Sequence, residues 1–178
     1  LGNKGGLNLI VSYEAFAMKM LGLMRQEIIF ARHQKQIGHA PGWLPVPLIV
    51  TSHTWENSKN EQSHQDPSLV EALLGEMADT SVVRFAADAN SALAMLRTTW
   101  SSHGRIVALV LPKRAVRSRM SPEQAEDLAR DGAVVLHGDP KASDLLLIAD
   151  GAYQLEQAES ARLRLQARGQ RVALIYLG

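Results

Sequence analysis

The stretch that decides the fold is Ile106-Val107-Ala108-Leu109-Val110-Leu111, in which every position is apolar. A strand that is apolar throughout, and not only at alternate positions, is typical of a parallel sheet whose two faces are both covered by helices. Six further short runs have a similar character, and most of them are apolar at nearly every position. These runs are residues 7–11, 46–51, 82–86, 133–136, 145–149 and 172–177.

Longer stretches with helical periodicity separate these runs. Two of them begin with an N-cap side chain followed by proline, at Asp66-Pro67 and Ser121-Pro122, and another ends before Gly169, a natural left-handed C-cap. The alternation of strands and helices predicts an α/β fold with a parallel sheet, helices on both faces and right-handed crossovers. Helices are expected at residues 13–36, from 67 onward, at 89–101, from 122 onward and at 152–168.

Composition excludes several classes of protein. Apolar residues make up 46% of the 178 residues and charged residues 21%, which is enough for a buried core and excludes wholesale disorder. The net charge of +1 provides no overall field for nucleic acid or an anionic membrane, so neither is expected as a partner. The absence of cysteine excludes disulfides, thiolate nucleophiles and Cys-ligated zinc. No apolar run is long enough to cross a bilayer, and we expect a soluble chain.

A basic segment at residues 113–119 interrupts the alternating pattern. We predict one layered domain over residues 1–120. Residues 121–178 are too few for a comfortable domain, and we interpret them as a linker and the beginning of a second α/β domain. Because the sequence starts at Leu1 instead of a methionine and stops just after a strand-like run, we expect a fragment of a longer protein.

Three polar or aromatic clusters directly follow predicted strands, at residues 12–16, 53–66 and 113–114. Because ligands gather at the carboxyl ends of parallel strands, we expect the three clusters to meet at one edge of the sheet. The second cluster is unusually long for a connection and carries two histidines, two asparagines and a lysine, which suit a phosphate or sugar hydroxyls. Its length alone leaves open a functional loop and a solvated surface loop.

Taken singly, these residues are ambiguous. His53 or His64 alone fits a structural histidine as well as a proton-transfer group. Tyr13 and Phe16, three positions apart on a helix, fit a core contact as well as a cofactor contact. Lys113 fits a solvated basic linker as well as an anion ligand. The spacing of His and Glu matches no known zinc motif, and neither a P-loop nor a G-x-S-x-G motif is present.

Three motifs follow one another along the chain: Ser12-Tyr13-Glu14-Ala15-Phe16, Thr51-Ser52-His53-x-Trp55 and Asn60-x-x-Ser63-His64-Gln65-Asp66-Pro67. In this order they resemble the pyrimidine-binding domain of the phosphoketolases, which are thiamine diphosphate enzymes of the transketolase superfamily. Segment 84–90 resembles the family's strand-to-helix segment V-Y-L-P-P-D-A-N, and Lys113 falls where the family has a lysine after the next strand. Residues 144–177 resemble the first βαβ unit of the superfamily's C-terminal domain, so the resemblance covers nearly the whole chain.

The resemblance implies that the intact parent is a lyase. Phosphoketolases cleave xylulose 5-phosphate or fructose 6-phosphate with inorganic phosphate, giving acetyl phosphate and a shorter aldose phosphate. The implied cofactors are thiamine diphosphate and magnesium, whose metal ligands are expected outside this chain. The family also implies a cytoplasmic homodimer with the site at the subunit interface. Because the family's cofactor-activating glutamate and its diphosphate-binding domain lie upstream, we expect these residues alone to be inactive.

The resemblance also assigns roles to particular side chains. Tyr13 and Phe16 are expected to flank the aminopyrimidine ring, and His64 to act as the catalytic proton-transfer group. The residues expected to face the sugar phosphate or inorganic phosphate are His53, Asn57, Lys59, Asn60 and Lys113.

One loop departs from the family pattern. Where phosphoketolases have Gln-Asp-His-Asn-Gly-Phe, the chain places Asn57 for the glutamine and Lys59 for the histidine. Two alternatives therefore stay open: another thiamine diphosphate-dependent, transketolase-like enzyme with a different substrate, and a non-catalytic α/β assembly module.

Overall fold

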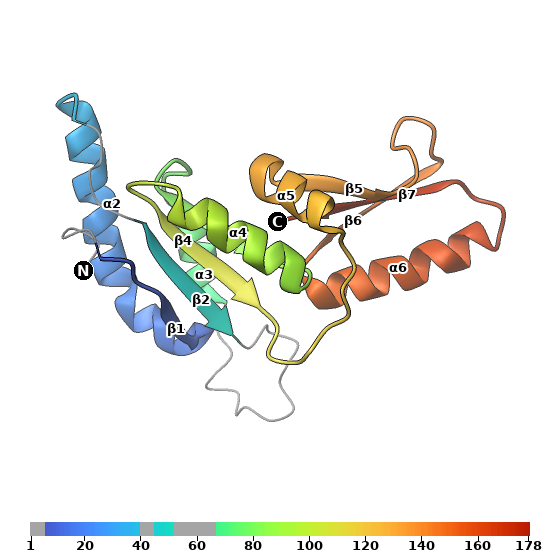
Figure 1. Cartoon of the computed structure of the whole chain (residues 1–178), viewed down its shortest axis with the longest axis horizontal. Coiled ribbons are helices and arrows are strands. Elements are labelled where there is room, and N and C mark those ends of the chain that lie inside the picture. The colour runs from blue at the N-terminus through green and yellow to red at the C-terminus, as the bar shows by residue number, and fades with distance from the viewer. Residues whose placement is uncertain (1–5, 40–44, 52–66) are drawn as a thin grey trace. The chain divides into compact units, whose positions relative to one another are not determined.

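The computed structural model describes residues 6–39, 45–51 and 67–178, and they adopt the predicted α/β fold (Figure 1). The chain divides into two compact units. The first holds residues 1–84 and 96–113, and the second holds residues 85–95 and 114–178. The predicted domain boundary at residue 120 stays a prediction, because a compact unit need not coincide with a family domain.

The first unit is built on a four-stranded sheet in the order β1-β2-β4-β3. Strand β2 pairs in parallel with both β1 and β4, which confirms the parallel sheet. Its centre is dry, because Leu48, Val50 and Leu109 are almost completely buried. The strands are β1 (Ile10–Tyr13), β2 (Val46–Thr51), β3 (Ser81–Phe85) and β4 (Ile106–Leu111).

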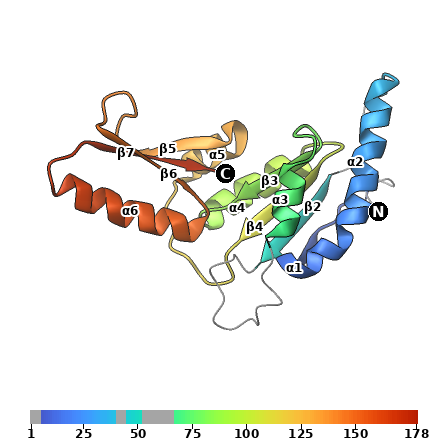
Figure 2. The ribbon, with the colours of Figure 1, turned by 180° about the vertical axis from the view of Figure 1, so that it is seen from behind.

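The helix predicted for residues 13–36 is divided in the structure. Helix α1 (Glu14–Ala17) leads through a 3-10 turn, η2 (Met18–Met20), into α2 (Leu21–Gln36). Helix α2 buries one stripe of side chains at helical spacing, and α3 (Ser68–Leu74) contacts α1 (Figure 2). Helix α4 (Ala89–Trp100) connects β3 to β4. The buried stripe of α2 is Leu21, Met24, Ile28 and Ala31.

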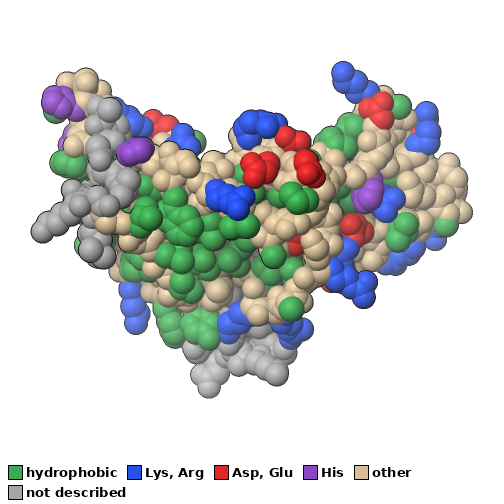
Figure 3. Space-filling view, in the orientation of Figure 1, with side chains coloured by type: hydrophobic (Ala, Val, Ile, Leu, Met, Phe, Trp, Pro, Cys, Tyr) green, Lys and Arg blue, Asp and Glu red, His purple; other side chains and the backbone are tan. Residues whose placement is uncertain are grey.

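Strand β1 begins later than the sequence predicts. The apolar run 7–11 indicated a strand there, whereas the paired residues are Ile10–Tyr13. Leu7, Leu9 and Val11 are exposed. In the orientation of Figure 1, hydrophobic side chains form a broad patch on the surface of the first unit (Figure 3). The limits of β1 follow its pairing with β2, which an apolar pattern alone does not encode.

The second unit contains a three-stranded sheet in the order β5-β7-β6. Strands β6 and β7 are parallel and joined by a helix, as predicted, but β5 is antiparallel to β7. The parallel arrangement expected from the alternating strands and helices therefore does not extend to β5. Residues 138–144, which follow it, contain no helix that could form a parallel crossover. The elements are α5 (Pro122–Asp131), β5 (Ala133–His137), β6 (Leu145–Asp150), α6 (Ala152–Gln166) and β7 (Val172–Leu177).

Two buried polar side chains organise the second unit. The Asp88 carboxylate accepts four hydrogen bonds, from the backbone N–H and hydroxyl of Ser91 and from the backbone N–H groups of Arg119 and Met120. Tyr176 is fully buried; its hydroxyl accepts from the Gly151 N–H at 2.9 Å and donates to the Phe85 carbonyl at 2.8 Å. These bonds tie segment 85–95 to the rest of the unit.

The start signal at Ser121 is confirmed. Its hydroxyl accepts from the Gln124 N–H, and the Gln124 side chain accepts from the Ser121 N–H, which forms a capping box at the beginning of α5. Gly169 adopts the left-handed conformation expected of it, with φ of 81°. Among the helices that the structure describes, none combines the length and apolar character needed to traverse a bilayer.

Candidate functional site

Three parallel strands of the first unit end in one row. In the strand register Tyr13 lies opposite Thr51, and Thr51 lies opposite Leu111, so β1, β2 and β4 terminate at the same level. The Thr51 hydroxyl donates to the Ser12 carbonyl across the first pair at 3.5 Å. The carboxyl ends of these strands therefore form the single edge at which the sequence predicts a site.

Tyr13 and Lys113 meet at this edge. The Lys113 ammonium donates to the Tyr13 hydroxyl at 3.1 Å, and its Nζ lies 4.2 Å from the centre of the Tyr13 ring. Residues one hundred positions apart in sequence are thus brought into contact by the shared strand level. The contact joins a cation to both the polar end and the face of an aromatic ring, an arrangement that stabilises the charge.

Phe16 extends the aromatic surface. Strand β1 passes directly into α1 at Tyr13, so Phe16 follows one helical turn later. The two rings meet edge to face, with centroids 5.7 Å apart and planes at 88°. Phe16 remains 42% exposed, so part of this apolar surface is open to a ligand. A partly exposed aromatic pair suits the flat, weakly polar ring of a cofactor.

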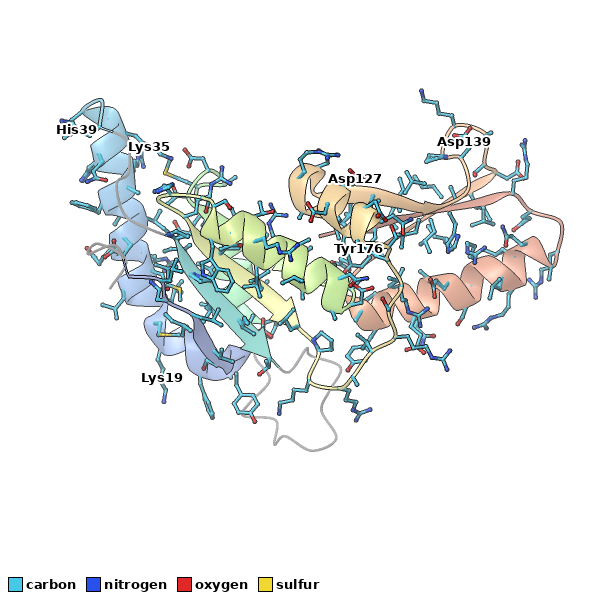
Figure 4. The ribbon with its side chains drawn as sticks, in the orientation of Figure 1. Lys19, Lys35, His39, Asp127, Asp139 and Tyr176 are labelled. Atoms are coloured by element: carbon cyan, nitrogen blue, oxygen red, sulfur yellow. The ribbon has the colours of Figure 1, made fainter. Side chains whose placement is uncertain are left out.

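Two charged residues at this edge were not predicted as site residues. The Lys19 ammonium lies 5.8 Å from the centre of the Phe16 ring (Figure 4). Its position three residues after Phe16 is the signal that could have found it. Glu14, between the two aromatic residues in sequence, is only 4% exposed, although a buried carboxylate is uncommon. Cationic side chains therefore adjoin both rings.

Five predicted site residues lie outside the described residues, because segment 52–66 is not described. Their roles stay predictions: proton transfer for His64, and contact with substrate or phosphate for the other four. Those four are His53, Asn57, Lys59 and Asn60. The segment begins immediately after Thr51, at the edge where Tyr13 and Lys113 meet.

The described residues provide no evident metal centre. In ranges 6–39, 45–51 and 67–178, no three His, Asp or Glu side chains gather closely enough to hold an ion. The aromatic pair and Lys113 have the chemistry to contact an aromatic ring and an anionic group. Divalent cations such as Mg²⁺ prefer oxygen ligands, so a metal would depend on other residues.

A protein-family model matches the N-terminal part of the chain, which includes the aromatic pair of this edge. The family model described as D-xylulose 5-phosphate/D-fructose 6-phosphate phosphoketolase matches residues 2–102. The chain belongs to this phosphoketolase family. The match includes Tyr13, Phe16 and the whole of segment 52–66, whereas Lys113 lies beyond it.

Individual relatives agree with the phosphoketolase assignment. A probable phosphoketolase from Streptomyces avermitilis is 26% identical over 169 residues, covering 90% of this chain and 21% of the relative. The chain thus spans about a fifth of that relative's length. A crystal structure of a transketolase mutant, R525L, from Pichia stipitis is similar over 96% of the chain and 22% of its own, with a TM-score of 0.75 and 17% identity.

A second solved structure is similar over a larger share of its own chain. It is a split-gene transketolase whose description, "inactive beta4 tetramer", refers to its subunits. It matches 98% of this chain and 50% of its own, with a TM-score of 0.63 and 18% identity. At these identities the likeness establishes a transketolase-type fold for the phosphoketolase-family chain.

Proposed function

We propose that this chain forms the pyrimidine-binding side of a thiamine diphosphate site in a phosphoketolase-type lyase. The reaction would cleave a ketose phosphate with inorganic phosphate to acetyl phosphate and an aldose phosphate. The observation that carries the proposal is the meeting of Tyr13, Phe16 and Lys113 at the carboxyl edge of a parallel sheet. Family membership through residues 2–102 supports the same conclusion.

Tyr13 and Phe16 would hold the aminopyrimidine ring. Their edge-to-face contact fixes the two planes relative to each other, and the exposed part of Phe16 offers an apolar surface that excludes water. When bound, thiamine diphosphate supplies the nucleophilic carbon that phosphoketolase chemistry requires. The aromatic pair contributes orientation, because a ring held against a rigid surface has less rotational freedom to lose.

Lys113 would bind the phosphate group of the substrate or the attacking inorganic phosphate. An ammonium has three N–H donors, so its bond to the Tyr13 hydroxyl does not exhaust its capacity for an anion. That bond and the underlying ring hold the ammonium at the edge in advance of binding. A lysine positioned in this way loses less conformational entropy when phosphate arrives.

His64, His53, Asn57, Lys59 and Asn60 complete the proposed site from segment 52–66. His64 would donate or accept a proton near neutral pH, and the others would contact phosphate or sugar hydroxyls. The metal that accompanies the diphosphate would be held by residues other than those described, and a second subunit would close the site. Similarity to a split-gene transketolase described as inactive leads us to propose that this chain needs a partner for turnover.

The proposal is tested on the protein isolated from its native host together with any chains bound to it. Calorimetric titration with thiamine diphosphate and Mg²⁺ is expected to give saturable binding. Xylulose 5-phosphate and inorganic phosphate are expected to give acetyl phosphate. Bound cofactor without acetyl phosphate would indicate a different substrate, and absence of cofactor binding would refute the proposed function.

Two variants separate the roles at the sheet edge. Lys113→Met removes a charge-assisted hydrogen bond worth about 1.5–3 kcal/mol, so the KM for phosphate should rise about 10- to 150-fold. Tyr13→Phe keeps the ring and removes the hydroxyl, so cofactor affinity should change little. Lys141→Met, in an exposed turn of the second unit, is the matched control and should leave both quantities unchanged. An unchanged KM for phosphate in Lys113→Met would contradict the role given to this lysine.

A further inference from the structure

A small recess in the first unit brings two arginines together away from the candidate site. It is lined by Arg84 on β3, by Arg105 just before β4 and by hydroxyl-bearing residues at the end of α4. Lys113 lies eight residues beyond Arg105 along an extended strand, which places the two backbones about 26 Å apart. The recess and the Tyr13–Lys113 pair therefore lie toward opposite ends of β4.

Among the residues that the structure describes, no carboxylate pairs with the positive charge in this recess. Arg84 Nη1 is buried and, among the described residues, has no hydrogen-bond partner. Within those same ranges, neither Arg84 nor Arg105 takes part in an ion pair with a carboxylate. Burial lowers the pKa of the Arg84 guanidinium, and the nearby charge of Arg105 lowers it further. Two like charges beside an unsatisfied donor are costly unless something compensates them.

Neither a helix end nor a water molecule compensates the charge fully. The last turn of α4 adjoins the recess, and a helix C-terminus carries a partial charge of about −0.5. Set against two full positive charges, this leaves an excess of about +1.5. A bound water could accept from Arg84 Nη1, but it would leave that excess unchanged. A ligand with two negative charges would both satisfy the donor and balance the arginines.

We propose that Arg84 and Arg105 form a binding site for a small tetrahedral oxyanion, either inorganic phosphate or the phosphoryl group of a sugar phosphate. The recess has room for about one water-sized atom. One anion oxygen would therefore enter it and accept from Arg84, while the remaining oxygens lie at the surface beside the exposed Arg105. Planar guanidinium groups donate pairs of N–H bonds that match such oxygens. This site does not depend on the proposed function.

Phosphate binding by the purified chain tests the site. Inorganic phosphate and fructose 6-phosphate are titrated separately, with ³¹P NMR line broadening or calorimetry as the readout, against wild type and the variants Arg84→Met and Arg105→Met. Each variant is expected to raise the Kd of at least one of the two ligands tenfold or more. The ligand that responds identifies the source of the oxyanion.

Two controls keep the test decisive. Arg97→Met removes the same charge from α4 outside the recess and should leave the Kd unchanged. Lys141→Met, at an exposed turn position of the second unit, should also leave this Kd unchanged. If Arg84→Met does not fold by circular dichroism, Arg105→Met, at an exposed position, gives the result. Binding lost in Lys113→Met but kept in both arginine variants would overturn the proposal, as would no phosphate binding in wild type at tens of millimolar.

Discussion

Replacing Asp88 by asparagine removes one acceptor from a buried side chain that accepts four hydrogen bonds. Asp88 is 3% exposed, and one oxygen, Oδ2, accepts from the Arg119 N–H at 2.7 Å and the Met120 N–H at 2.9 Å. In Asp88→Asn a donating amide group takes the place of this oxygen or of Oδ1, which Ser91 uses. With the amide at Oδ2, both backbone hydrogen bonds are lost and donors face donors. With the amide at Oδ1, the Ser91 N–H faces a donor, while the Ser91 hydroxyl can donate to the Asp88 carbonyl oxygen 3.0 Å away.

The expected loss of stability follows from these bonds. Each buried donor left unsatisfied costs about 1–3 kcal/mol, so the orientation that leaves one donor unsatisfied costs about 1–3 kcal/mol and the one that leaves two costs about 2–6 kcal/mol. The amide should adopt the less costly orientation. The nearby Asn90 amide donates to the Met120 carbonyl at 2.8 Å and to the Ser118 hydroxyl at 3.3 Å, and these bonds would keep part of the connection in place. The loss should therefore fall short of the upper limit.

The effect should also depend on pH in a defined direction. Burial raises the pKa of Asp88, but hydrogen bonds from Ser91, Arg119 and Met120 outweigh it and hold the pKa below its ordinary value of 3.8. A carboxylate with a depressed pKa stabilises the folded state fully above its unfolded pKa and loses that contribution as pH falls through the folded pKa. The gap between wild type and Asp88→Asn should be constant from about pH 7 to 5 and should narrow below about pH 4.

Guanidinium unfolding across this pH range measures the gap, and hydrogen exchange reports on the Arg119 and Met120 amides. Asp127→Asn is the matched control, because Asp127 is an exposed carboxylate on α5 that pairs only with Arg130 among the described residues (Figure 4). Exposed pairs contribute about 0–1 kcal/mol, so the control should change little. A loss below about 1 kcal/mol in Asp88→Asn, with unchanged exchange at the two amides, would refute this reasoning.

Four further substitutions have expected outcomes in the second unit. Tyr176→Phe loses both hydroxyl hydrogen bonds, and the unfolding free energy should fall by about 2 kcal/mol in guanidinium titration. Gly138→Ala places a Cβ 2.7 Å from the Val172 carbonyl oxygen, whereas Gly169→Ala has the same left-handed strain but open space. The first should cost at least about 3 kcal/mol and the second about 1 by the same measurement; equal values would contradict the close approach. Ser121→Ala removes the capping box and should cost about 1 kcal/mol, with faster amide exchange in the first turn of α5.

Sequence alone predicts the central strands best. Runs 46–51, 106–111 and 172–177 coincide with β2, β4 and β7, because a strand buried on both faces is apolar at nearly every position. The edge strand β1 is predicted less well. Its limits depend on which residues of β2 it pairs with, and Leu7 and Leu9 are apolar without being paired. The direction of β5 depends on the absence of a helix in the connection that follows it, residues 138–144. The absence of a helix is a weaker sequence signal than the apolar residues of a strand.

The Asp88 contacts mark a clear limit of sequence reasoning. Segment 84–90 resembles a family segment, yet its sequence does not indicate that Asp88 has hydrogen-bond partners about thirty residues later in the chain. The partners are backbone N–H groups at positions 119 and 120, and every residue except proline carries such a donor. A buried carboxylate that accepts from backbone atoms can be recognised in sequence only as an unexplained acidic residue. Its partner becomes visible only when the chain is folded.

In contrast to the Asp88 contacts, the meeting of Tyr13 and Lys113 could be predicted from the sequence, because both residues lie at the ends of predicted parallel strands. Lys113 lies outside the region that the phosphoketolase family model matches, so family membership alone does not attach it to the site. What attaches it is the parallel register, in which β1, β2 and β4 end at one level and whatever follows them must share an edge. A strand slip of two residues would keep every side chain on its face and yet move Lys113 by about 6.6 Å, farther than its bond to Tyr13 could follow. The contact between Tyr13 and Lys113 therefore depends on strand register as much as on the identity of the two residues.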